Sequence, residues 1–155
     1  MKSHQYKTDL KWTGNRGNGT AGYRSYDRSY SVMINGKPTL EGSADPAFRG
    51  DVSKWNPEEL FLASLTACHM LWYLHLCADE EIHVMSYKDQ ASGVMEEMDN
   101  GSGKFAEVVL HPQVTITHTV NLDKAEKLHQ RANEMCFIAN SCNFPVRHEV
   151  KMKLI

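Results

Sequence analysis

One segment of this chain is apolar over nineteen residues, and it restricts the folds that the sequence can adopt. Between Leu60 and Ala78 the polar residues are Ser64, Thr66, His69 and His75. The length is close to the ~20 residues that cross a bilayer, but carboxylates flank both ends and no basic residue sets an orientation. A helix that is apolar on all sides in a soluble chain must be surrounded by protein. We therefore expect a central helix of a folded domain and no membrane span.

The residues before this segment are typical of a helix start. Asn56 can cap the helix, and Pro57 suits the first helical position. Glu58 and Glu59 favour the positive end of the helix dipole. Glu59 also follows Asn56 by three residues, which is the spacing of a capping box. The pattern predicts a helix that begins at Pro57.

An all-apolar helix needs cover on every side. A single layer of strands covers only one face of it. A second copy of the chain can cover the other face. We therefore expect an obligate homodimer.

The rest of the chain alternates between strand and helix patterns. Strands are predicted at residues 4–12, 20–34, 37–40, 82–98, 105–120 and 146–154. Asn35-Gly36 is a strong hairpin signal between two of these strands, and Pro112 marks an edge or a bulge. An apolar stripe predicts a second helix over 123–136. Without a repeat or a linker, the sequence predicts a single α+β domain over residues 1–155.

Charge and composition exclude some partners. The chain has 17 basic and 19 acidic residues and a net charge of -2, without the basic stripe of a nucleic-acid-binding protein. The N-terminal residues lack the apolar core of a secretory signal. Four cysteines without such a signal favour a reducing compartment. We therefore expect a cytoplasmic protein that binds neither nucleic acid nor membrane.

Two of the cysteines lie on apolar helical faces, Cys68 in the first helix and Cys136 at the end of the second. A free cysteine often packs in a core as a small hydrophobe. Cys77, nine residues after Cys68, faces away from it by about half a turn. Cys77 and Cys142 are both interpreted as packing residues.

Two kinds of cysteine site do not fit the spacing. There is no Cys-x-x-Cys pair, and His69 and His75 are six residues apart, so they do not share a helix face. We therefore expect no metal site. A hydrolase that pairs Cys68 with His69 fails because adjacent helix residues diverge by ~100°.

Peroxide chemistry fits the residues better. It needs a thiolate, a nearby cation and a second thiol that traps the sulfenic acid. Arg16, in a glycine-rich turn, is a candidate cation for Cys68, and Glu58 could hold the guanidinium in a bidentate pair. A solvated turn arginine and a dipole-stabilising glutamate are the ordinary interpretations of Arg16 and Glu58. Other candidate cations are Arg24, Arg28 and Arg49.

Several motifs together resemble those of the OsmC/Ohr family, which comprises the osmotically induced protein and the organic hydroperoxide resistance protein. They are Trp12–Thr20, Asn56-Pro-Glu-Glu-Leu60, Ala67-Cys68 and Cys136-Phe-Ile-Ala-Asn-Ser141. The resemblance implies antiparallel sheets packed around a central apolar helix in an intertwined homodimer. It also implies a thiol-dependent peroxidase that needs no metal or organic cofactor and is reduced by an external dithiol.

The resemblance implies a role for four residues. Cys68 matches the peroxidatic cysteine and Cys136 the resolving cysteine. Arg16 matches the catalytic arginine, and Glu58 matches the glutamate that orients it. The apolar residues around Cys68 favour an organic hydroperoxide over hydrogen peroxide; they are Leu65, Met70, Leu71 and Trp72.

The chain departs from the family pattern at three positions. Phe137 follows Cys136 where the best-known members have proline, and His69 follows Cys68 where phenylalanine is common. Cys142 offers a competing resolving thiol. Two alternatives therefore stay open beside the peroxidase: a non-enzymatic stress or small-molecule binding protein, and a redox sensor that is not cycled.

Helix geometry constrains the implied site. Glu58 and Cys68 are ten residues apart, which is ~15 Å along one straight helix. Either the helix breaks between them, or Glu58 of one chain serves Cys68 of the other. We expect the second arrangement, with the active site at the dimer interface.

Overall fold

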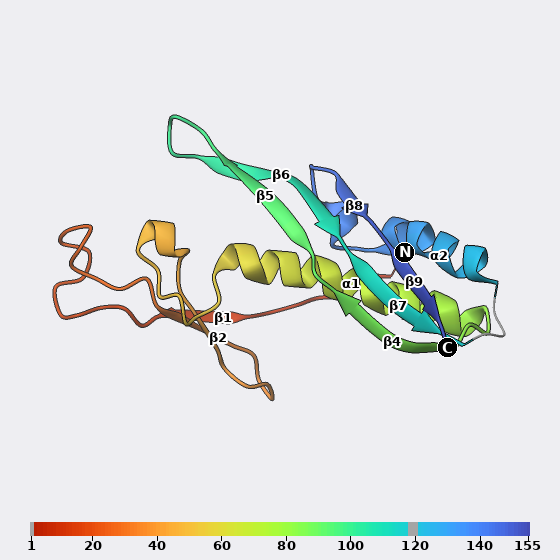
Figure 1. Cartoon of the computed structure of the whole chain (residues 1–155). Helices are drawn as coiled ribbons and strands as arrows, with labels where there is room; N and C mark the ends of the chain where they lie inside the picture. Colours follow the sequence, from red (N-terminus) through yellow and green to blue (C-terminus); the bar gives the residue numbers. More distant parts are fainter. Residues whose placement is uncertain (1, 118–120) are drawn as a thin grey trace. The chain divides into compact units, whose positions relative to one another are not determined.

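The computed structural model describes residues 2–117 and 121–155, which form two compact units, Met1–Phe61 and Leu62–Ile155. Each unit is described by itself. Along the chain (Figure 1) the elements are β1 (Asp9–Trp12), β2 (Tyr30–Met33), β3 (Leu40–Gly42), η1 (Pro46–Phe48), α1 (Pro57–Asp79), β4 (Val84–Asp89), β5 (Ser92–Glu97), β6 (Gly103–Leu110), β7 (Pro112–Ile116), α2 (Leu122–Met135), η2 (Ala139–Ser141), β8 (Val146–His148) and β9 (Lys151–Leu154). The predicted α+β class is confirmed.

The first unit contains an antiparallel sheet in the order β1-β2-β3. The predicted hairpin turn joins β2 to β3, and Gly36 has φ 78° there. The amide of Lys37 donates to the carbonyl of Ile34 at 3.0 Å and closes the turn. Glycine suits this position because a left-handed backbone strains other residues.

The predicted strand over 20–34 is wrong for most of its length, since β2 covers only Tyr30–Met33. The rings of Tyr23 and Tyr26 both contact the guanidinium of Arg28, at 4.3 and 4.2 Å from the ring centroids. The same guanidinium donates to the carbonyls of Tyr23 at 2.7 Å and Tyr26 at 2.8 Å. These carbonyls bond a side chain instead of a neighbouring strand, so the tyrosines stabilise a loop.

The start of α1 is the predicted capping box. The amide of Glu59 donates to Oδ1 of Asn56 at 2.7 Å, and the amide of Asn56 donates to Oε2 of Glu59 at 3.1 Å. The helix then continues without a break from Pro57 to Asp79. By length and composition α1 could cross a membrane, a test that the core helix of a soluble protein also passes.

The second unit contains two three-stranded sheets, β4-β7-β9 and β5-β6-β8. In each sheet one pair is antiparallel, and the last strand runs parallel to its neighbour. The sheets are therefore mixed where antiparallel sheets were expected. The reason is that α2 precedes β8 and β9, and a helical crossover is the connection that parallel strands need.

Three predicted strands are each divided at a matching point, between β4 and β5, between β6 and β7, and between β8 and β9. Where the strands are divided, the amide of His111 donates to Oδ1 of Asp89 at 2.7 Å. The amide of Glu149 donates to the carbonyl of Leu110 at 2.8 Å. Pro112 is the first residue of β7, a position where its missing N–H is tolerated. The last three residues predicted for this strand, 118–120, lie outside the described part of the chain.

The core of the second unit lies among α1, α2 and the sheet β4-β7-β9. Helix α2 is capped by Asn121, whose Oδ1 accepts from the amide of Lys124 at 3.2 Å. The buried residues of this cluster are Tyr73, Cys77, Ile82, Val114, Ile116, Ala125 and Ala132. This packing fixes α2, and with it the position of Cys136, on the rest of the unit.

Candidate functional site

The second unit brings Cys68 and Cys136 together. Cys68 lies in the middle of α1, and Cys136 is the C-cap residue of α2. The Cys68 thiol lies near enough to Cys136 to raise the pKa of Cys136, and both are free thiols. Two cysteines that lie near each other in this way are candidates for a disulfide.

The two thiols have different surroundings. Cys136 is 1% exposed, and its sulfur accepts a hydrogen bond from the amide of Ala139 at 3.4 Å. Burial, together with the hydrogen bond to Cys68, raises the pKa of Cys136 to about 11. Cys136 is therefore a protonated, enclosed thiol near neutral pH. Cys68 is partly exposed, so it is the thiol that a dissolved molecule can reach.

Apolar surface adjoins Cys68. Trp72 follows one turn later on the same helix face. Its ring contacts that of Phe137 edge to face, with centroids 5.8 Å apart. Trp72 also lines a small open pocket of about 190 Å³ with Leu71 and His75. An apolar group could rest there while its reactive end meets Cys68.

The other two cysteines lie apart from this pair. Cys77 is buried in the core beside Tyr73, as predicted for a packing residue. Cys142 is partly buried, and its thiol donates to the carbonyl of Ile138 at 3.2 Å. Burial raises the pKa of Cys142 as well.

Arg16 belongs to the first unit. Its guanidinium donates to the carbonyl of Arg24 at 3.1 Å and lies 3.3 Å from Oδ1 of Asp27. The loop that carries it passes close to the Asp27 backbone, since a Cβ added at Gly14 would lie 1.9 Å from the Asp27 carbonyl oxygen. Arg16 is thus presented by a loop that requires glycine.

Glu58 lies in the first turn of α1 and is partly buried. After burial, its charge is the second cause that raises the pKa of Tyr30. Its Oε2 is buried and, within the described residues, accepts no hydrogen bond. A carboxylate in this state is suited to a guanidinium donor, yet Arg16 of the same chain bonds elsewhere.

Of the two arrangements that the sequence left open, the one that needs a break in α1 is not observed. Helix α1 is continuous from Pro57 to Asp79, so ten residues of one helix, a rise of ~15 Å, separate Glu58 from Cys68 along the chain. Cys68 and Cys136 come together in the second unit, while Arg16 and Glu58 belong to the first.

Comparison with known proteins gives the family. Residues 50–151 match the sequence profile described as OsmC-like protein. A solved structure of an OsmC-like protein of unknown function from Vibrio cholerae is 30% identical, covers 96% of this chain and 99% of that chain, and superposes with a TM-score of 0.86. The chain belongs to the OsmC-like protein family.

More distant relatives share the fold. An organic hydroperoxide resistance protein from Elizabethkingia anophelis is 21% identical, with a TM-score of 0.70 and complete coverage of both chains. One from Legionella pneumophila is 20% identical over 97% of this chain and 99% of that chain, with a TM-score of 0.67. No curated protein matches the sequence.

This OsmC-like chain also contains a buried histidine cluster that the sequence analysis missed. His69 on α1 and His129 on α2 are 1% and 0% exposed, and Nε2 of His69 lies 3.0 Å from Nδ1 of His129. The ring of Tyr73 stacks on His129 at 3.7 Å. The ring of His148 lies 5.5 Å from His69 and 6.1 Å from His129.

Burial keeps these imidazoles neutral. It lowers the pKa of His69 to about 4, with His148 as a second cause. Burial, then His69 and His148, lowers the pKa of His129 to about 3. Nδ1 of His69 and Nε2 of His129 are buried without a hydrogen-bond partner in the part of the chain that is described. Within that part, no group of His, Cys, Asp or Glu is arranged to hold a metal ion.

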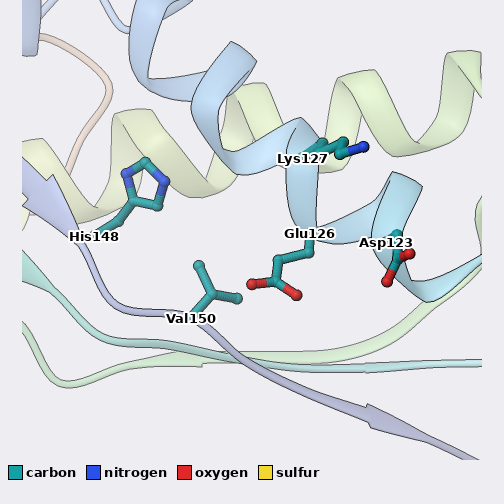
Figure 2. Close-up of a pocket in the computed structure, with 5 residues that line it drawn as sticks. All are labelled: Asp123, Glu126, Lys127, His148 and Val150. Atoms are coloured by element: carbon teal, nitrogen blue, oxygen red, sulfur yellow. The ribbon is translucent and has the colours of Figure 1, made fainter.

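His148 marks the outer end of the cluster. It lines an open pocket of about 440 Å³ with Val150 and three α2 residues, Asp123, Glu126 and Lys127. Figure 2 shows the His148 ring directed toward the helices, and the carboxylate of Glu126 directed toward Val150, which lies between β8 and β9. The ring of His148 thus connects the buried pair, His69 and His129, with this pocket.

The sequence did contain a signal for the cluster. His69 lies in a stripe of buried α1 residues at intervals of four, with Leu65, Tyr73 and Cys77. His129 lies between Ala125 and Ala132 on the apolar face of α2. Each histidine occupies a core position by periodicity, but the periodicity of a single helix does not show that the two rings meet.

Proposed function

We propose that this OsmC-like protein is a thiol-dependent peroxidase that reduces organic hydroperoxides through Cys68 and Cys136. The observation that carries the proposal is the contact between a reachable thiol on α1 and an enclosed thiol at the end of α2. The two hydroperoxide resistance proteins that share the fold support the same chemistry.

The first step takes place at Cys68. Its thiolate attacks the distal oxygen of the hydroperoxide, the O–O bond breaks, and the alkoxide takes up a proton to leave as an alcohol. Cys68 becomes a sulfenic acid. The apolar pocket at Leu71 and Trp72 favours a hydroperoxide with an apolar tail.

The second step uses Cys136. Its sulfur attacks the sulfenic sulfur, the S–O bond breaks, and the proton of the thiol leaves with the hydroxide as water. An external dithiol then reduces the disulfide by exchange and is itself oxidised. Because Cys136 is buried, peroxide meets Cys68 first.

Arg16 and Glu58 complete the proposed site. The guanidinium of Arg16 stabilises the thiolate and the charge that develops on the peroxide, and Glu58 orients it. The unbroken α1, with ten residues between Glu58 and Cys68, favours a Glu58 from a second chain over that of the same chain. We therefore place Glu58 of one subunit in the site of the other, in a homodimer.

The proposed cycle needs a supply of reducing dithiol, which fits a cytoplasmic location. Exposed apolar residues outside the pocket at Leu71 and Trp72 fit burial against a second copy of the chain; they include Met85, at 59% exposed, and Val94, at 51%.

The test is steady-state reduction of cumene hydroperoxide by the protein with dithiothreitol, beside the Cys68→Ser variant. The proposal predicts turnover that exceeds the rate with hydrogen peroxide and is lost in Cys68→Ser. A single oxidation without turnover would instead indicate a redox sensor. Absence of any reaction over minutes would indicate a binding protein, and either result overturns the proposal.

A further inference from the structure

The inner face of α2 has one large, fully buried side chain. The buried residues of this helix are Ala125, His129 and Ala132. Alanine side chains offer little shape to interlock with a neighbour, so they define the register of a helix weakly. Leu122 and Leu128 of α2 also pack against the core but are only partly buried, so His129 is the fully buried side chain that is best placed to define where α2 lies along α1.

His129 defines that position by a directional contact. Its Nδ1 lies 3.0 Å from Nε2 of His69, and its ring stacks on Tyr73 with an interplanar angle of 14°. A hydrogen bond holds a narrow range of geometries, whereas apolar packing tolerates small slides. A buried polar pair adds little net stability, and fixing a register is the best-attested use of such a pair.

The same contact lies close in sequence to both thiols. His69 directly follows Cys68 on α1, and Cys136 follows His129 by seven residues at the end of α2. Seven residues return a helix to within about 20° of the same direction and advance it by about 10.5 Å. Any slide of α2 at His129 is therefore transmitted to Cys136. A slide of one turn would move it by about 5.4 Å, beyond the geometry of a disulfide.

We propose that His129, through its bond to His69, is a positioning residue that holds Cys136 against Cys68. This role rests on the two-cysteine reaction proposed above. It acts on the second step, in which the S–S bond forms, and leaves the attack of Cys68 on peroxide unchanged. His129 touches neither sulfur and so is not itself catalytic.

The experiment measures how readily the two thiols join, without peroxide. The reduced protein, in a Cys142→Ser background, is equilibrated with mixtures of reduced and oxidised glutathione. One oxidised glutathione and the protein dithiol give the protein disulfide and two reduced glutathiones. The equilibrium constant reports the effective concentration of one thiol at the other.

Two replacements at His129 separate bonding from bulk. His129→Leu keeps a side chain of similar volume and removes both nitrogens, so the equilibrium constant is expected to fall about tenfold. His129→Asn keeps a polar atom at the position of Nδ1 and leaves a smaller side chain. The equilibrium constant of His129→Asn is expected to stay within about threefold of that of the parent protein.

Two further variants serve as controls. Leu128→Ala weakens the packing of α2 beside the bond between His69 and His129. Its equilibrium constant is expected to stay within about threefold of that of the parent protein. His69→Leu breaks the same bond from α1 and is expected to match His129→Leu. It replaces His129→Leu if that variant does not fold.

Four outcomes would overturn the positioning role. They are an unchanged constant in the leucine variants, an equal loss in His129→Asn, an equal loss in Leu128→Ala, and no Cys68–Cys136 disulfide in the parent protein. Failure to consume cumene hydroperoxide is a separate result. It would contradict the proposed function and leave the glutathione measurement valid, because glutathione is the oxidant there.

Discussion

Cys68 in the middle of α1 lies near enough to Cys136 at the end of α2 to raise its pKa, with Cys68 partly exposed and Cys136 buried. This asymmetry assigns an order to the two thiols. A dissolved oxidant reacts first with Cys68, and Cys136 reacts next because it is already in place.

Replacing Cys136 separates the two chemical steps. Cys136→Ser is expected to react once with cumene hydroperoxide and then to retain the sulfenic acid on Cys68, because the thiol that condenses with it is gone. Labelling with dimedone and mass spectrometry would detect the sulfenic acid. Cys142→Ser is the matched control and is expected to form the disulfide normally. Loss of the disulfide in Cys142→Ser would move the resolving role to Cys142.

The buried histidines predict a loss of stability in mild acid. In the unfolded chain histidine binds a proton near pH ~6.5, whereas burial holds the pKa of His69 at about 4 and that of His129 at about 3. Between the folded pKa values and pH ~6.5 the unfolded chain binds more protons than the folded chain. The free energy of unfolding therefore decreases as the pH is lowered through this range. Each histidine that stays neutral contributes a slope of ~1.4 kcal/mol per pH unit. Urea unfolding at pH 7, 6 and 5 would measure this slope.

The tyrosines and the third histidine that face the cluster do not offset this loss of stability in acid. Burial raises the pKa of Tyr73 and of Tyr87, so both stay neutral in this range. Burial also lowers the pKa of His148, which adds to the slope. The double variant His69→Leu, His129→Leu is expected to lose most of the slope. If its slope equalled that of the parent, the buried histidines would not be the cause.

The proposed shared site predicts complementation between inactive chains. Glu58→Gln and Cys68→Ser are each expected to lose most peroxidase activity. In a mixed dimer, Cys68 of the first variant meets the intact Glu58 of the second. Refolding equal amounts together should restore about a quarter of the sites, since half of the dimers are mixed and each has one intact site. Activity of the mixture under peroxide saturation would measure this fraction.

A second mixture controls for rearrangement. Cys68 and Cys136 meet within one unit of one chain. Co-refolded Cys68→Ser and Cys136→Ser chains are therefore expected to stay inactive. Recovery in this mixture, or none in the first, would contradict the shared site.

The capping box of α1 contributes to stability. Asn56→Ala removes the side chain that accepts from the Glu59 amide at 2.7 Å, and should lower the free energy of unfolding by about 1 kcal/mol. Asn56→Asp keeps the acceptor and should change the free energy of unfolding little. Urea unfolding compares the two. An equal loss in both variants would mean that the residue acts through its burial instead of its cap.

The elements with local signals were predictable. The start of α1 and the turn at Gly36 follow from a cap and turn residues that act within a few positions, and the extent of α2 follows from its apolar stripe. Arg28 shows the limit of such signals, because its contacts with Tyr23 and Tyr26 turn a strand-like composition into a loop. The division of the last strand at Glu149 depends on a bond to Leu110, a contact that periodicity does not reveal.

The site was less predictable from the sequence than these elements. The sequence chemistry left several partners open for Cys68, and the family resemblance implied Cys136. Their contact arises from the packing of two helices that are distant in the sequence. The bond between His69 and His129 depends on the same packing, so single-helix patterns could indicate two core positions but not that the rings meet. Arg16 and Glu58 keep their proposed roles as predictions.

Peptide mass mapping of the reduced protein, after one equivalent of cumene hydroperoxide, would show directly whether Cys68 and Cys136 react as a pair. A disulfide between Cys68 and Cys136 is expected to form within seconds, with Cys77 and Cys142 still reduced. If all four thiols stay reduced for minutes, the contact between Cys68 and Cys136 is inert packing and the peroxidase proposal is wrong.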